Sequence, residues 1–141
     1  SRSEASTAPA SHGSSPLVFL DAQVESWRRA VAYEMTNPLR LPSEKLRALV
    51  RRTFERALLC VRYHPDVWHD YASFEASCNN PSAAISVYER GLEAVPKCET
   101  LGFVAADYCE LEGRIDKARE VYSGLLEVCE GVVGRGGKGF G

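Results

Sequence analysis

The sequence predicts an all-α fold, a right-handed α–α solenoid built from about three helical hairpins. Three observations support it: six segments carry apolar residues at helical spacing, helix-breaking residues separate these segments, and one motif recurs after 34 residues. No segment alternates apolar and polar residues as a half-buried strand does. The 141 residues, of which 45% are hydrophobic and 26% charged, suit one folded domain.

The expected helices follow from apolar residues at positions i, i+3, i+4 and i+7. The clearest stripe runs from Leu46 through Phe54 to Val61. Residues that restrict φ or lack a backbone N–H interrupt the pattern at Asn37-Pro38, His64-Pro65, Asn80-Pro81, Pro96 and Gly113. We therefore expect helices over about residues 22–37, 43–64, 66–79, 81–95, 98–112 and 115–129.

The repeat is visible in the second helix of each hairpin. Phe54-Glu55-Arg56-Ala57-Leu58 recurs 34 residues later as Tyr88-Glu89-Arg90-Gly91-Leu92, and after another 34 as Tyr122-Ser123-Gly124-Leu125-Leu126. In the first helices, Trp27 and Tyr33-Glu34 match Trp68 and Phe74-Glu75, with an insertion at Leu39–Lys45. A helix–turn–helix period of 34 residues is typical of tetratricopeptide-like (TPR-like) solenoids.

These boundaries divide the chain into three parts. Residues 22–130 form the repeat domain, with repeats at about 22–65, 66–96 and 97–130. Residues 1–21 are rich in Ser, Ala and Pro and are expected to be a disordered leader, because such a composition buries little apolar surface. Residues 131–141 are rich in Gly and are expected to form a flexible tail.

The residues within the repeats resemble the half-a-TPR (HAT) repeat of RNA-processing proteins. That repeat has a Trp and an aromatic-Glu pair on its first helix, an aromatic-Glu-Arg-Ala/Gly-Leu block on its second, and a closing Pro, here Pro65 and Pro96. The stretches WRRAVAYEMTNPLRL and FERALLCVRYHPDVWHDYASFE are similar to the suppressor-of-forked family, the large scaffold subunit of cleavage stimulation factor. The third repeat departs from the pattern, with Gly102 at the Trp position and Cys109 at the Glu position, so we expect it to pack more loosely.

The resemblance covers about residues 25–128 and implies a function. It implies a non-catalytic protein-interaction scaffold in mRNA 3′-end processing, which is the cleavage and polyadenylation of pre-mRNA. The expected location is the nucleus, and the expected partners are other subunits of that machinery, together with a second copy of the chain. Two alternatives stay open: a HAT scaffold in pre-mRNA splicing or ribosomal RNA processing, and direct RNA binding by the first repeat.

The recurring positions are expected to hold the repeats together. Large aromatic side chains at repeat spacing each remove roughly 150–250 Å² from water when buried. Glu34 with Arg56, and Glu75 with Arg90, are expected to pair within a repeat or else to lie on solvated faces. The repeat-packing residues are Trp27, Tyr33, Glu34, Phe54, Arg56, Pro65, Trp68, Tyr71, Phe74, Glu75, Tyr88, Arg90, Pro96, Tyr108 and Tyr122.

Charge is distributed unevenly along a chain whose net charge is −2. Residues 28–62 contain nine Lys and Arg against three acids, and residues 66–130 contain five against thirteen. The basic first repeat is the reason to consider RNA contact, although helical spacing spreads its cations around a polar face as in a solvated helix. The candidates for RNA contact are Arg28, Arg29, Arg40, Arg47, Arg51, Arg52 and Arg62.

The sequence predicts no enzyme, metal site or cofactor. The five cysteines include no CxxC pair, and four of them are expected in the core. His64 and His69 stand five apart across Pro65, so they do not share a helix face as zinc ligands, and His64 is expected at a helix C-terminus. The GxGxxG match over residues 134–139 follows no strand. The apolar runs are too short to span a bilayer, and the first of them follows no charged segment of a signal peptide.

Overall fold

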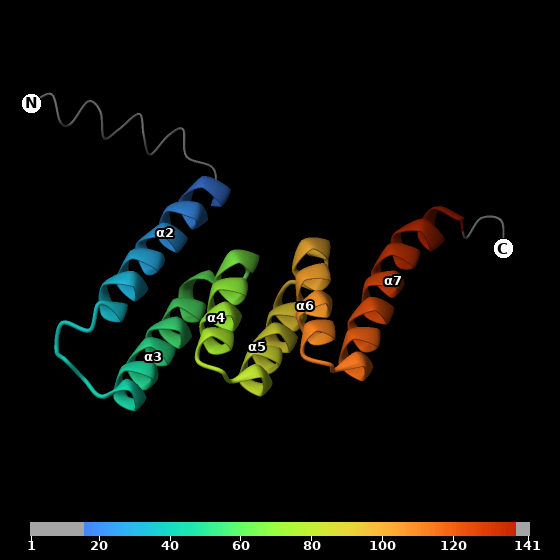
Figure 1. The fold of residues 1–141 in the computed structure, drawn as a ribbon. Helices are drawn as coiled ribbons and strands as arrows, with labels where there is room; N and C mark the ends of the chain where they lie inside the picture. Colours follow the sequence, from blue (N-terminus) through green and yellow to red (C-terminus); the bar gives the residue numbers. More distant parts are fainter. Residues whose placement is uncertain (1–15, 138–141) are drawn as a thin grey trace, which may run out of the picture. The chain divides into compact units, whose positions relative to one another are not determined.

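The computed structural model describes residues 16–137, and all of its regular secondary structure in this range is helical (Figure 1). The described helices are α2 (Pro16–Met35), α3 (Ser43–Val61), α4 (Pro65–Ser77), α5 (Pro81–Ala94), α6 (Glu99–Leu111) and α7 (Ile115–Gly137). They form two compact units, one ending at Val61 and one beginning at Arg62. The all-α fold of helical hairpins predicted from the sequence is confirmed.

The inner helix boundaries lie within a few residues of those expected, but the two outer boundaries differ. Helix α2 begins at Pro16, inside the segment assigned to a disordered leader. Proline suits the first turn of a helix, where its missing N–H would have no intrahelical acceptor. Helix α7 continues to Gly137, so residues 131–137 of the segment expected to form a flexible tail are helical. The expectations for residues 1–15 and 138–141 lie outside the described residues.

The first unit is the α2–α3 hairpin. Helix α3 buries one stripe, which includes Val50, Phe54 and Leu58, and α2 contributes Val24 and Val31. This spacing places the apolar residues of α3 on a single face, as the sequence predicted.

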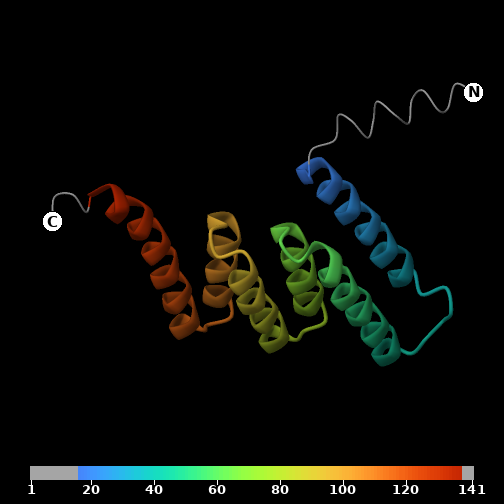
Figure 2. The same cartoon turned by 180° about the vertical axis from the view of Figure 1, so that it is seen from behind.

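In the second unit, α4 packs on α5, α5 on α6, and α6 on α7 (Figures 1 and 2). Helix α4 starts at Pro65 after an N-cap, His64, whose Nδ1 accepts from the backbone N–H of Asp66 at 3.3 Å. The placement of His64 at a helix C-terminus is therefore wrong, because α3 already ends at Val61. Asn80 caps α5 in the same way, with its side-chain oxygen accepting from the N–H of Ala83.

A large side chain meets a glycine where the two helices of each hairpin of this unit cross. A Cβ added to Gly91 of α5 would lie 2.8 Å from Cβ and Cγ of Trp68 on α4. A Cβ added to Gly102 of α6 would lie 2.5 Å from Cδ2 of Leu125 on α7. The third repeat is therefore closely packed at this position, contrary to the sequence-based expectation, because Leu125 fills the space that the missing Trp leaves.

The middle of the second unit joins three helices. Ile85, Cys109 and Ala118 form a buried cluster, and Tyr108 and Tyr122 pack against it. Of the cysteines, only Cys109 is fully buried. Cys78 and Cys98 are half-buried, and Cys60 and Cys129 are exposed. The expectation that four cysteines lie in the core is therefore wrong. The exposed ones lie on α3 and α7 outside the buried stripe. No helix among the described residues combines the length and apolar character needed to cross a membrane.

Candidate interaction surfaces

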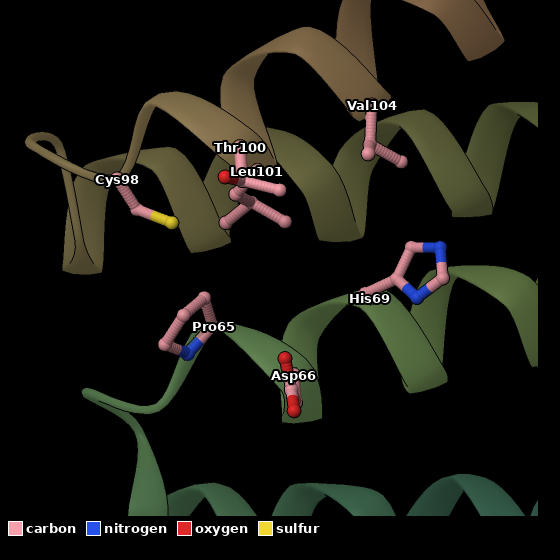
Figure 3. A pocket seen from close by; sticks show the side chains of 7 residues that line it. All are labelled: Pro65, Asp66, His69, Cys98, Thr100, Leu101 and Val104. Atoms are coloured by element: carbon pink, nitrogen blue, oxygen red, sulfur yellow. The ribbon is translucent and has the colours of Figure 1, made fainter.

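The second unit has a groove between α4 and α6, the first helices of its two hairpins (Figure 3). The cavity measures about 370 Å³. Pro65, Asp66 and His69 line one side, and Cys98, Thr100, Leu101 and Val104 line the other. The His69 ring projects into the space between the helices, opposite Val104.

This groove combines two kinds of surface. Leu101 is buried and Val104 half-buried, so they form an apolar wall, while Asp66, His69 and Thr100 are exposed. A mixed lining of this kind suits a protein segment, which presents backbone hydrogen-bonding groups and side chains together. Within residues 16–137 no group of three or more His, Cys, Asp or Glu is placed to hold a metal ion.

A second groove lies between α5 and α7, the second helices of the same hairpins. Its cavity measures about 430 Å³ and contains Leu92, Val121 and Val128 beside acidic residues. Lys117 Nζ lies 2.6 Å from Glu89 Oε2, and this hydrogen-bonded ion pair raises the pKa of Lys117. The acidic character expected of the later repeats is thus partly neutralised at this groove.

A third cavity, of about 440 Å³, lies in the first unit at the turn between α2 and α3. Tyr33 of α2, Leu39 and Leu41 of the turn, and Leu49 of α3 line it. Tyr33 is 65% exposed and Leu39 73% exposed. The expectation that Tyr33 packs in the core is therefore wrong, because α3 covers another side of α2.

The repeat-packing residues separate into a buried and an accessible set. Those buried in the structure are Phe54, Trp68, Tyr71, Phe74, Glu75 and Tyr88. Those half-buried are Trp27, Glu34, Pro65, Tyr108 and Tyr122, and those exposed are Tyr33, Arg56, Arg90 and Pro96. All four aromatic positions of the second repeat are buried, whereas the first and third repeats each have aromatic positions that are half-buried or exposed.

The two carboxylates of the aromatic-Glu pairs have different surroundings. Glu34 accepts from the hydroxyl of Thr53, whose Oγ1 lies 2.7 Å from Oε1 and 2.8 Å from Oε2. Thr53, and not Arg56, is therefore its partner, because Thr53 lies on the buried side of α3 and Arg56 is exposed. Glu75 is 2% exposed, and its pairing with Arg90 stays a prediction. The Arg90 guanidinium lies 5.3 Å from the ring centroid of Trp68.

The arginines considered for RNA contact do not share one arrangement. Arg28 forms an exposed ion pair with Glu25 at 2.9 Å, and the Arg62 guanidinium lies 5.3 Å from the ring centroid of Tyr63. Arg47 and Arg51 are half-buried, and Arg29, Arg40 and Arg52 are exposed. Those of the first unit therefore differ in accessibility, and direct RNA contact through them stays a prediction.

Sequence reasoning missed the three cavities and the hydrogen bond between Thr53 and Glu34. Grooves between non-adjacent helices require the packing of hairpins against one another, which the period alone does not describe. The exposed Leu39 left a sequence signal, because it stands in an insertion between helices and outside any helical stripe.

Comparison with known proteins identifies the family. The family described as suppressor of forked protein matches residues 4–134. Cleavage stimulation factor subunit 77 of Arabidopsis thaliana is 31% identical over 106 residues, covering 75% of this chain and 14% of that protein. The mRNA 3′-end-processing protein RNA14 of Candida glabrata is 26% identical over 105 residues, 74% of this chain and 16% of the relative.

Another mRNA 3′-end-processing protein, rna14 of Aspergillus fumigatus, is 29% identical over 126 residues, which is 82% of this chain and 12% of that protein. The chain therefore spans less than a fifth of the length of these relatives. The resemblance recognised in its Trp, aromatic-Glu and Asn-Pro-Leu-Arg motifs is confirmed. With its repeated helical hairpins and a family match across most of its length, the chain belongs to the suppressor-of-forked family.

Proposed function

We propose that this chain is a non-catalytic protein-interaction segment of a scaffold for pre-mRNA cleavage and polyadenylation, and that it acts in the nucleus. The relatives are named for mRNA 3′-end processing and for cleavage stimulation, and the chain matches only a small part of each. Its partners in this proposal are other subunits of the same machinery.

The observation that carries the proposal is the groove between α4 and α6. Successive first helices of a helical repeat present their outward side chains along a common surface, which such proteins use for extended binding. In this groove the carboxylate of Asp66, the imidazole of His69 and the hydroxyl of Thr100 stand beside apolar Leu101 and Val104. A segment of a partner can therefore bury side chains and form hydrogen bonds at the same place.

Association with a second copy is a further part of the proposal. Ile115 and Leu126 on α7 are exposed, whereas Leu125 between them in sequence is buried against Gly102. The opposite charges of the early and later repeats would orient two copies, and apolar contact would supply a contribution that salt does not screen. Sedimentation at low salt and at roughly 0.5 M salt tests this. A chain that stays monomeric at tens of micromolar in both would contradict self-association.

The function is tested by proximity cross-linking of the tagged whole chain in cells, followed by quantitative mass spectrometry of the captured proteins. We expect cleavage and polyadenylation factors to be enriched. Thr100→Arg, which places a long cation in the groove, should reduce that enrichment severalfold. Glu110→Arg, at an exposed position of the same helix outside the groove, is the matched control.

The same experiment separates the alternatives. Enrichment of splicing factors or ribosomal RNA processing factors in place of cleavage factors would overturn the assignment to 3′-end processing. Cross-links to RNA that persist when protein partners are removed would favour direct RNA binding by the first repeat.

A further inference from the structure

The cavity at the α2–α3 turn presents apolar side chains to solvent. Tyr33 and Leu39 are mostly exposed, and Leu41 and Leu49 are half-buried beside them. All of these residues belong to the first unit, so the cavity is formed by one hairpin alone. An apolar cavity that one hairpin completes by itself can receive an apolar side chain from another molecule.

The turn that carries Leu39 is held by its own hydrogen bonds. The side-chain oxygen of Asn37 accepts from the N–H of Leu41 at 2.8 Å, and its side-chain nitrogen donates to the carbonyl of Leu41 at 2.9 Å. The N–H of Arg40 donates to the carbonyl of Asn37 at 3.0 Å. The side chain of Leu39 is therefore presented from a backbone that is already ordered, which lowers the entropy lost on binding.

Two residues of this turn have a left-handed backbone. Asn37 and Arg40 both have φ of 55°. Asparagine adopts this conformation readily, but a long side chain such as that of Arg40 does so rarely. Strained positions of this kind occur preferentially at ligand-binding sites, where they set the direction of a side chain.

Four exposed basic residues, called the rim below, stand next to or within one helical turn of residues that line the cavity, although none of the four is itself a lining residue. Arg29 lies one turn before Tyr33 on α2, Lys45 and Arg52 lie one turn before and after Leu49 on α3, and Arg40 lies in the turn. All four are exposed, and none forms an ion pair within residues 16–137. The one acid in the lining is Glu34, which is held by Thr53.

We propose that this cavity binds an acidic peptide segment of a protein partner, with an apolar side chain of the segment inserted between Tyr33, Leu39 and Leu49. Acidic residues on either side of that anchor meet the rim cations, while the anchor avoids the carboxylate of Glu34. The inference deepens the proposed function. It depends on that function in one respect, namely that the chain binds proteins.

A protein segment fits this site better than RNA does. The lining is mainly aliphatic, whereas single-stranded nucleic acid is bound by aromatic platforms on which bases stack. The carboxylate of Glu34 in the lining also repels phosphate. RNA is therefore an alternative occupant that the experiment must be able to reveal.

The test uses the whole chain and a short fluorescein-labelled synthetic peptide with a central Leu-Phe pair flanked by Glu and Asp. Fluorescence anisotropy should give a Kd on the order of tens of micromolar at low salt, weakening as salt rises. Two matched peptides, one with Lys in place of the acids and one with Ser-Ser in place of Leu-Phe, should each bind at least about tenfold more weakly.

Variants locate the site. Leu39→Ser and Tyr33→Ser should each weaken binding by about tenfold, whereas Leu111→Ser, at an equally exposed position of the second unit, should leave it unchanged. Arg40→Asn keeps a residue that tolerates the left-handed backbone but removes the charge, so binding should weaken severalfold and depend less on salt. Unchanged helical circular dichroism shows that each variant is folded.

Several results would overturn the proposal. They are equal binding of the acidic and Lys peptides, wild-type binding by both Leu39→Ser and Tyr33→Ser, or a Kd weaker than roughly 1 mM. Binding of labelled oligouridine with no binding of the acidic peptide would assign the rim to RNA. If the whole chain fails to enrich cleavage factors but still binds the peptide, the proposed function fails while this site stands. If the whole chain enriches those factors but does not bind the peptide, the proposed function stands while this site fails.

Discussion

The second and third hairpins place a large and a small residue at the same crossing in opposite order. In α4–α5 the large residue, Trp68, comes from the first helix and meets Gly91. In α6–α7 the glycine, Gly102, is on the first helix and meets Leu125 of the second. Trp68 and Gly102 are 34 positions apart in the sequence, and so are Gly91 and Leu125. The repeat therefore requires one large and one small side chain at the crossing, and either helix can supply the large one.

The two crossings differ in their polar contacts. The Trp68 indole N–H donates to the carbonyl of Arg62 at 2.6 Å, and the guanidinium of Arg90 stands over its ring. Leu125 has no polar atom in its side chain and is held by packing alone. We therefore expect the second hairpin to depend more on its large residue than the third does.

The largest effect is expected from Trp68→Ala. Trp68 is 4% exposed, so the substitution leaves a cavity and removes the indole hydrogen bond, and should cost about 3–5 kcal/mol of unfolding free energy. Thermal melts followed by circular dichroism measure this. An unchanged melting temperature would show that the crossing does not support the hairpin.

A smaller loss is expected at the corresponding crossing of the third hairpin. Leu125→Ala should cost about 2–3 kcal/mol, because the side chain is buried against Gly102 but makes no hydrogen bond. Leu126→Ala is the matched control, since Leu126 is exposed and should change stability little. Urea denaturation of both variants checks the difference, and equal losses would remove Leu125 from the core.

The two glycines should respond differently to alanine. A Cβ at Gly91 meets Cβ of Trp68, which is attached to the backbone, so Gly91→Ala should cost about 1–2 kcal/mol despite the better helix propensity of alanine. At Gly102 the nearest atom is Cδ2 at the end of the Leu125 side chain, which can rotate away. Gly102→Ala should therefore be within about 0.5 kcal/mol of neutral. Equal effects in denaturant melts would contradict the comparison.

An effect confined to high pH concerns the equivalent tyrosines of the two hairpins. Burial raises the pKa of Tyr88 to about 12, and desolvation also raises that of Tyr122. A raised folded-state pKa means that the folded protein holds the proton more tightly. This contribution is complete below about pH 10 and is lost as the pH rises toward about 12.

Melts between about pH 9 and about pH 11.5 should therefore show a steeper fall for the wild type than for Tyr88→Phe, by about 1–2 kcal/mol at the upper end. Tyr122→Phe is the comparison, and it should change the slope less because Tyr122 is only half-buried. An identical slope in the wild type and in Tyr88→Phe would mean that Tyr88 is not desolvated.

The amino-acid sequence was sufficient for the order and the inner boundaries of the helices, the 34-residue period and the family. Helix starts such as Pro65 and Pro81 depend on local properties of the chain, namely a fixed φ and a missing N–H, which can be recognised without any tertiary contact. The apolar stripe of α3 also predicted most of its buried residues, because a helix can cover only one face against its neighbour. Leu46 and Leu49 of that stripe are only half-buried, and the buried Thr53 lies outside it.

Contacts between helices required the tertiary structure. Tyr33 and Phe74 stand at equivalent repeat positions, yet one is exposed and the other buried, because burial depends on whether a neighbouring helix covers that side. Glu34 accepts from Thr53 because α3 turns that hydroxyl toward α2, and the arginine of the repeat motif lies on the outer side. The large residue is on the first helix in the pair Trp68 and Gly91, and on the second helix in the pair Gly102 and Leu125. This difference can be recognised only when the facing residues are known, because two helices share the space at a crossing and neither sequence position determines it alone.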